Sequence, residues 1–147
     1  FSSIEFQHGK ATIVDDYGHH PREMNATMLA ARHVWPDKKL ILVFQPHRYT
    51  RTQELFADFV DTMREADHVL LLDIYPAGEP PIDGINSLAI CSSLKQKGFD
   101  QCDYISSFEN LDSRLHEIAK DGDIILMQGA GNIGQMVPQL VKKYQHA

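Results

Sequence analysis

The sequence has few cysteines and no long apolar run. Only two cysteines, Cys91 and Cys102, occur among its 147 residues. A chain of this length can bury enough apolar surface to fold without covalent cross-links, which favours a reduced, cytoplasmic setting over a disulfide framework. No stretch approaches the roughly 18–20 consecutive apolar residues of a membrane span, and the first residues carry no basic-then-apolar signal sequence. We therefore expect a cytoplasmic protein without a membrane partner.

Positive charge is also in short supply. The chain holds 14 Lys and Arg against 20 Asp and Glu, a formal charge of −6. Such a chain offers no broad attraction to nucleic acid or to anionic lipid. Its apolar content of 43% is ordinary for a globular protein and too high for a disordered one. The composition and length together predict one folded domain and exclude nucleic acid as a partner.

Two motifs of well-known enzyme classes are missing. The sequence contains no Gly-x-x-x-x-Gly-Lys-Ser/Thr phosphate loop, so the chain cannot by itself form the standard cradle for a nucleoside triphosphate. No serine or cysteine stands in a recognisable nucleophile elbow. The first residue is Phe1 instead of Met, which we interpret as a sign that the chain is a piece of a longer polypeptide.

Short apolar runs alternate with amphipathic segments along the chain. The runs predict strands at residues 11–14, 40–44, 69–74, 102–105 and 123–128. The segments between them predict helices at 22–35, around 55–63, at 87–97, around 111–119 and through 137–144. Near-continuous apolar strands separated by helices are typical of a mostly parallel sheet with helices on both faces. The expected fold is therefore a doubly wound α/β domain.

Polar or glycine-rich loops come directly after four of the predicted strands. We name them loop 1 (residues 15–21), loop 2 (45–52), loop 3 (75–84) and loop 4 (129–134). In an open parallel sheet, ligands bind beyond the carboxyl ends of the strands. We therefore expect the four loops to form one site at that edge of the sheet.

Loop 1 combines two carboxylates, Asp15 and Asp16, with two imidazoles, His19 and His20. Both side-chain types bind zinc or manganese, so a metal site is one interpretation. Adjacent residues on an extended backbone point to opposite sides, however, so the four cannot all converge on one ion. Helix capping with surface polarity, and contacts to a nucleotide or substrate, are the other two interpretations.

Loop 2 concentrates His47, Arg48 and Arg51 within five residues of an acidic protein. Two arginines three residues apart at a strand-to-helix turn can present forked donors to a carboxylate or a phosphate. The start of the following helix adds unsatisfied N–H groups. The loop predicts an anion site, and the alternative is an ion pair of Arg51 with Glu54 or Asp58 on the helix.

Loop 3 is rich in proline and glycine and contains Glu79 and Asp83. Its carboxylates can meet a substrate ammonium group or serve only in turns, and the sequence does not favour either interpretation.

Loop 4, Gly129-Ala130-Gly131-Asn132-Ile133-Gly134, matches the dinucleotide-binding pattern GxGxxG between a strand and a helix. That pattern also needs a further strand with an acidic residue about 20 positions later, and the chain ends after one helix. We favour a second interpretation, in which the glycines let backbone amides approach a phosphate or a carboxylate.

Taken together, four segments resemble the C-terminal domain of the Mur ligases of bacterial peptidoglycan synthesis. They are residues 15–21, 44–52, the run Tyr75-Pro76-Ala77-Gly78-Glu79, and 129–134, and they occur in the family's order over essentially the whole chain. The run His47-Arg48-Tyr49-Thr50-Arg51 resembles the members that add L-alanine to UDP-N-acetylmuramate. The resemblance implies a Rossmann-like domain over residues 1–147. It also implies an N-terminal UDP-sugar domain and a central ATP domain that are not in this chain.

The activity implied by the resemblance is ATP-dependent amide bond formation in the cytoplasm. ATP phosphorylates the carboxylate of UDP-N-acetylmuramate, and the amine of L-alanine attacks the acyl phosphate. The implied cofactors are ATP and Mg²⁺. The resemblance implies that the metal is held mainly by the absent central domain, and it assigns no metal ligand to this chain. The implied partners are L-alanine, ATP, UDP-N-acetylmuramate and the other two domains, and the fragment alone is expected to be inactive.

The resemblance also assigns roles to single residues. It implies that Asp16 bonds the ribose of ATP, and that Tyr17 and His19 lie near the nucleotide and the amino acid. The catalytic residues that it implies are His47, Arg48 and Arg51, with both arginines also holding the substrate. Nucleotide contacts are implied for Asp16, Tyr17, Gly129 and Gly131.

The sequence departs from the family at Arg22, which stands where a threonine is frequent and weakens a helix-capping role at that position. Two other functions remain open on the sequence alone. One is a free-standing module that binds a nucleotide or small molecule, and the other is a metal-dependent hydrolase built on loop 1.

Overall fold

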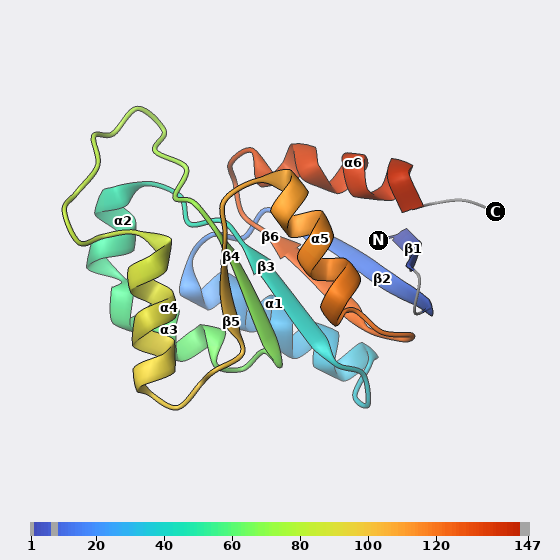
Figure 1. The fold of residues 1–147 in the computed structure, drawn as a ribbon. Coiled ribbons are helices and arrows are strands. Elements are labelled where there is room, and N and C mark those ends of the chain that lie inside the picture. Colours follow the sequence, from blue (N-terminus) through green and yellow to red (C-terminus); the bar gives the residue numbers. More distant parts are fainter. Residues whose placement is uncertain (1, 7–8, 145–147) are drawn as a thin grey trace.

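The computed structural model describes residues 2–6 and 9–144, in which six strands form one sheet with helices on both faces (Figure 1). In chain order the strands are β1 (Ser2–Phe6), β2 (Gly9–Asp16), β3 (Leu40–Phe44), β4 (His68–Leu72), β5 (Cys102–Ile105) and β6 (Ile124–Gln128). The helices are α1 (Pro21–Val34), α2 (Tyr49–Glu54), α3 (Phe56–Met63), α4 (Ser87–Gln96), α5 (Phe108–Ile118) and α6 (Ile133–Tyr144). Within the described residues, no helix has the length and apolar character needed to cross a bilayer.

The strands lie in the order β1-β2-β6-β3-β4-β5 across the sheet. Five of them, from β2 to β5 in this order, pair in parallel, and β1 pairs antiparallel with β2 at one edge. The predicted doubly wound, mostly parallel α/β fold is thereby confirmed. Strand β1 was not predicted, because its five residues give too short an alternation to indicate a strand.

Two apolar layers enclose the sheet. One face packs against α5 and α6, and the other against α1, α3 and α4. Every residue of β3, β4 and β6 is buried, which explains their continuous apolar runs, since both faces of these strands are covered. In the second layer the fully buried rings of Phe44 and Phe59 lie 5.5 Å apart. The sheet is therefore a rigid support for the loops at its carboxyl edge.

The two cysteines belong to this second layer. Cys91 on α4 and Cys102 on β5 are both buried and free, with their Sγ atoms 2.6 Å apart. Both thiols therefore belong to the apolar core, where a free cysteine packs as a small apolar side chain.

Residues 49–63 form two helices where the spacing of Leu55, Phe59 and Met63 predicted one. Leu55 leaves the helical conformation, with φ −108° and ψ 18°, so that α2 ends before it and α3 begins after it. Its N–H still bonds the carbonyl oxygen of Arg51 at 3.0 Å, and the apolar residues keep their spacing of four. The spacing of the apolar residues therefore does not reveal the break. The break separates α2, which contains Arg51, from α3.

The start of α1 depends on His20. Its Nδ1 accepts a hydrogen bond from the backbone N–H of Arg22 at 3.1 Å, and Glu23 accepts in return from the backbone N–H of His20 at 3.1 Å. This reciprocal cap satisfies two of the amides that a helix start leaves unpaired. His20 thus makes the cap, and the arginine at position 22 does not prevent it.

The packing of Phe59 gives a test of the fold. We expect Phe59→Ala to lower the free energy of unfolding by about 3–5 kcal/mol, because it opens a cavity against Phe44 in a fully buried layer. Urea denaturation followed by circular dichroism measures this change. Leu88→Ala on α4 is the control, since Leu88 is 57% exposed and its truncation should cost little. Equal losses in both variants would contradict the described core.

Candidate functional site

The four loops meet at the carboxyl edge of the sheet. Gly129 of loop 4 donates its N–H to the backbone oxygen of Asp16 in loop 1 at 3.1 Å. His47 of loop 2 forms an isolated parallel bridge with Tyr75 of loop 3. The sequence prediction of one site built from all four loops is consistent with this arrangement, in which β2, β6, β3 and β4 deliver their loops side by side.

A row of three rings lies across the loops. The His19 and His47 ring centroids are 5.4 Å apart, and the rings of His47 and Tyr75 stack at 5.5 Å with an interplanar angle of 11°. Gly131 packs against the Tyr75 ring, so closely that a Cβ added to the glycine would lie 2.6 Å from Cγ of Tyr75. Only glycine fits there, so Gly131 serves the close approach of loops 3 and 4.

Arg48 stands at the start of α2 with a backbone φ of 72°. A non-glycine residue in this left-handed region is strained, at a cost on the order of 1–3 kcal/mol. Hydrogen bonds on both sides of its backbone hold it there. Its N–H donates to the oxygen of Tyr75 at 2.8 Å, and its carbonyl oxygen accepts from the Thr52 hydroxyl at 2.8 Å. Its side chain is exposed at the edge of the site.

Arg51, one turn into α2, is half-buried and carries an unsatisfied donor. Its Nη1 is buried without a hydrogen-bond partner. Among the described residues it forms no ion pair, so the alternative of pairing with Glu54 or Asp58 is not what the structure contains. A buried unpaired guanidinium nitrogen is costly in a folded protein and calls for an anionic partner.

His47, in the same loop as Arg51, also has a buried nitrogen without a hydrogen-bond partner, its Nδ1. Burial lowers the pKa of His47, and the positive fields of His19, Arg48 and Arg51 lower it further. His47 is therefore neutral near pH 7. An anion placed among these groups would offset the cationic neighbours, so loop 2 combines forked donors with an imidazole whose charge responds to the ligand.

Glu79 of loop 3 is committed to the backbone of loop 2. Its two carboxylate oxygens accept from the N–H of Thr50 at 3.0 Å and from the Thr50 hydroxyl at 2.7 Å. These two bonds lower its pKa, the hydroxyl contributing most. Of the two interpretations left open for this loop, the structural one fits Glu79. It caps the first turn of α2 from a distant loop, while Asp83 is exposed.

Asp16 ends β2 with its carboxylate fixed from three sides. Its Oδ2 accepts from Nε2 of Gln128 at 2.6 Å, from the N–H of Gly18 at 3.0 Å and from the Thr27 hydroxyl at 3.2 Å. The neighbouring Tyr17 is 81% exposed. Loop 1 therefore presents one rigid acid and one exposed aromatic ring.

The metal interpretation of loop 1 finds no support in this geometry. His20 serves as the cap of α1, and Asp15 is exposed. Among the described residues, no three His, Cys, Asp or Glu side chains are grouped so that they could hold a metal ion.

Loop 4 is organised by Gln45, the residue after β3. The Gln45 side chain donates to the Oδ1 of Asn132, and its Oε1 accepts from the N–H of Ile133 at 3.0 Å. An amide at the start of α6 is thus satisfied within the protein, which limits the phosphate-binding role predicted for these backbone amides.

Sequence reasoning missed Gln45, Gln128 and the stacking role of Tyr75. Both glutamines are buried, at 5% and 0% exposure, and each directly follows or ends an otherwise apolar strand. A polar amide closing a buried strand was the available signal, because a buried polar group needs a partner.

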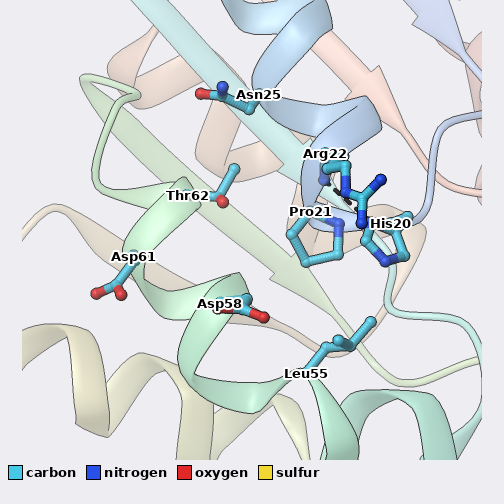
Figure 2. Close-up of a pocket in the computed structure, with 8 residues that line it drawn as sticks. All are labelled: His20, Pro21, Arg22, Asn25, Leu55, Asp58, Asp61 and Thr62. Carbon is cyan, nitrogen blue, oxygen red and sulfur yellow. Dashed lines mark hydrogen bonds between the residues drawn. The ribbon is translucent and has the colours of Figure 1, made fainter.

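A hollow of about 400 Å³ lies beside loop 1, between the start of α1 and α3 (Figure 2). It is lined by His20, Pro21, Arg22, Asn25, Leu55, Asp58, Asp61 and Thr62. None of the predicted site residues, all of which the structure describes, lines it. The dashed line in Figure 2 is the hydrogen bond from the backbone N–H of Arg22 to His20 that caps α1. The hollow therefore lies next to the start of α1, where this helix meets α3.

Comparisons with known proteins add to this geometry. The family profile described as "Mur ligase, glutamate ligase domain" matches residues 3–131. The crystal structure of UDP-N-acetylmuramate-alanine ligase MurC from Thermotoga maritima superposes with a TM-score of 0.72 and 25% identity, over 92% of this chain and 27% of that one.

Two further structures share the fold. A murein peptide ligase, mpl, from Psychrobacter arcticus has a TM-score of 0.73 and 18% identity, over 95% of this chain and 28% of that one. A domain of a putative UDP-N-acetylmuramate:L-alanyl-gamma-D-glutamyl-meso-diaminopimelate ligase from Haemophilus ducreyi has a TM-score of 0.67 and 20% identity, over 95% of this chain and 96% of that one. The chain thus spans little more than a quarter of the MurC and mpl chains. With a profile that covers most of its residues, the chain belongs to the Mur ligase family, as the domain found at the C-terminal end of its members.

Proposed function

We propose that the chain is the amino-acid-binding domain of a cytoplasmic, ATP-dependent ligase that joins L-alanine to UDP-N-acetylmuramate in peptidoglycan synthesis. The observation that carries the proposal is the pair of buried nitrogens without hydrogen-bond partners in loop 2, the donor Nη1 of Arg51 and Nδ1 of His47. Family membership and the likeness to the MurC structure from Thermotoga maritima support it.

In this proposal the carboxylate of L-alanine binds to loop 2. A forked guanidinium suits a carboxylate because two parallel N–H···O bonds form at once, and Arg51 has a buried nitrogen without a partner. Glu79, the nearby carboxylate of loop 3, is held by Thr50 and does not compete for this arginine. His19 lies beside loop 2 on the loop 1 side, with its ring centroid 5.4 Å from that of His47.

The chemistry then proceeds at the boundary with the other domains. The phosphate loop and Mg²⁺ belong to the central domain in this proposal, and Mg²⁺ neutralises the charge of the ATP phosphates when bound. The alanine nitrogen attacks the acyl carbon of the UDP-N-acetylmuramoyl phosphate, a C–N bond forms, and the C–O bond to phosphate breaks. Arg48, exposed at the site edge, stabilises charge that develops on the leaving phosphate. This chain thus contributes orientation and charge stabilisation.

Asp16 is assigned to the nucleotide. Its Oδ2 already accepts from Gln128 and from the N–H of Gly18, so Oδ1 is the oxygen left for a ribose hydroxyl of ATP. Tyr17, exposed in the single domain, contacts the nucleotide or the amino acid once the central domain closes over it. Gly129 and Gly131 lie at the same edge and line the nucleotide side.

A ligase that adds a peptide instead of alanine is the second candidate. The structures from Haemophilus ducreyi and Psychrobacter arcticus carry the names of peptide-adding ligases, and their folds match about as closely as that of MurC. The full-length enzyme offered L-alanine and the tripeptide L-alanyl-γ-D-glutamyl-meso-diaminopimelate in competition would separate the two.

The role of Arg51 can be tested in the full-length enzyme. We expect Arg51→Lys to raise the KM for L-alanine about tenfold, because a bidentate pair with the carboxylate becomes a single contact. The KM for ATP should change little. Arg64→Lys, at an exposed residue after α3, is the matched control. An unchanged KM for L-alanine in Arg51→Lys would remove this residue from the proposed anchor.

The charge state of His47 gives a test by NMR titration of its ring protons in the isolated chain. The pKa should lie below the ordinary value of about 6.5, and Arg48→Gln should raise it by removing a cationic neighbour. Because the folded-state pKa is lowered, the stability that His47 contributes is present above pH 6.5 and is lost as pH falls through the folded-state pKa. A pKa at or above the ordinary value would contradict the described surroundings of the ring.

The isolated chain distinguishes a ligase domain from a free-standing binding module. We expect calorimetry to find weak or undetectable binding of ATP, AMP and L-alanine to the 147-residue chain, because the remaining contacts belong to other domains. Tight binding of any of the three ligands would favour the module.

A further inference from the structure

Gln128 is the polar end of β6, a strand in which every residue is buried. The other four residues of β6 are apolar and buried, and Gln128 itself is 0% exposed. β6 pairs with β2 on one side and β3 on the other, so its last residue lies between loops 1 and 2. A methionine or leucine at this place would continue the apolar pattern, but it would remove a hydrogen-bond donor from the Asp16 carboxylate.

The side-chain amide of Gln128 is only half satisfied. Its Nε2 donates to Oδ2 of Asp16 at 2.6 Å, whereas its Oε1 is buried without a partner. An unsatisfied buried acceptor costs about 1–3 kcal/mol. Turning the amide over does not help, because it would bring Oε1 against the Asp16 carboxylate. The contact with Asp16 is therefore the reason for the orientation of this amide.

The backbone of loop 1 packs closely against the pair on the side of Gly18. A Cβ added to Gly18 would lie 2.6 Å from Nε2 of Gln128 and 2.7 Å from Oδ2 of Asp16, so loop 1 folds directly over the two groups. The residue after Gln128, Gly129, donates its N–H to the carbonyl oxygen of Asp16 at 3.1 Å. The end of β6 thus holds Asp16 by both its side chain and its backbone.

We propose that Gln128 is a positioning residue that fixes the Asp16 carboxylate so that its Oδ1 meets the ribose of the nucleotide. This rests on the proposed function, in which Asp16 bonds ATP. Gln128 itself touches no ligand and acts through Asp16. The cost of its unpaired Oε1 is the cost of holding the acid in one rotamer before the nucleotide arrives.

The test uses the full-length ligase with Gln128→Met, Asp16→Asn and the double variant. Gln128→Met should raise the KM for ATP about tenfold, the scale of a lost hydrogen bond to a charged group, and leave the KM for L-alanine within about twofold. Its urea midpoint should change little, because the variant removes the unsatisfied Oε1 together with the hydrogen bond to Asp16. In the Asp16→Asn background the same change should add nothing to the KM for ATP. Gln96→Met, at an exposed residue ending α4, is the control.

Three results would overturn the proposal: an unchanged KM for ATP in Gln128→Met, an effect that adds fully to that of Asp16→Asn, or a lowered urea midpoint with both KM values altered alike. The last would mean a purely structural role.

A second measurement needs no activity. In protein labelled with ¹⁵N-glutamine, the Gln128 side-chain amide should show a downfield proton that Asp16→Asn abolishes. The proposed reaction and the positioning role can fail separately. If the full-length protein joins no L-alanine, the proposed reaction is refuted. If it still shows this signal, and its calorimetric ATP affinity falls in Gln128→Met, the positioning role is retained. The positioning role would be refuted if Asp16→Asn left the downfield amide signal in place and Gln128→Met left the ATP affinity unchanged.

Discussion

Parallel pairing of β6 with β2 and β3 sets the place of every group in the site. Parallel strands end at one edge, and here the three strands end with Asp16, Gln128 and, directly after β3, Gln45. Because β3 and β6 are covered on both faces, the polar side chains at their ends, Gln45 and Gln128, are buried and must find partners in neighbouring strands or in the loops. Gln128 finds Asp16, and Gln45 finds the start of α6. The pairing of these strands thus fixes the positions of the polar side chains at the carboxyl edge of the sheet.

The cationic loop stays available because the carboxylate of Glu79, in the adjoining loop 3, bonds Thr50. An acidic protein would be expected to pair Arg51 with one of its many carboxylates, yet Glu79 bonds the start of α2 through Thr50. The same bonds tie loop 3 to loop 2 and so hold the His47–Tyr75 stack in register. One carboxylate therefore serves as helix cap and as loop anchor while the guanidinium remains unneutralised.

The sequence indicated the fold through its most buried parts. Continuous apolar runs at 40–44 and 124–127 left few alternatives to a covered parallel sheet, and loop 2 predicted an anion site by residue type alone. It could not indicate which acid meets which donor, since Gln128 and Asp16 are separated by 112 positions and Glu79 and Thr50 by 29. It also could not show the break at Leu55, where a change in two backbone angles leaves the apolar spacing intact.

The positive φ of Arg48 has a consequence for how this position can change. The backbone there favours glycine, whereas the anion site requires a cation, so local preference and the demands of the site conflict at a single residue. Substitution by glycine would relax the turn and discard the charge, and substitution by lysine would keep the charge and the strain. Position 48 is thus locally frustrated: the amino acid that would best relieve the backbone strain differs from the one that would best bind an anion.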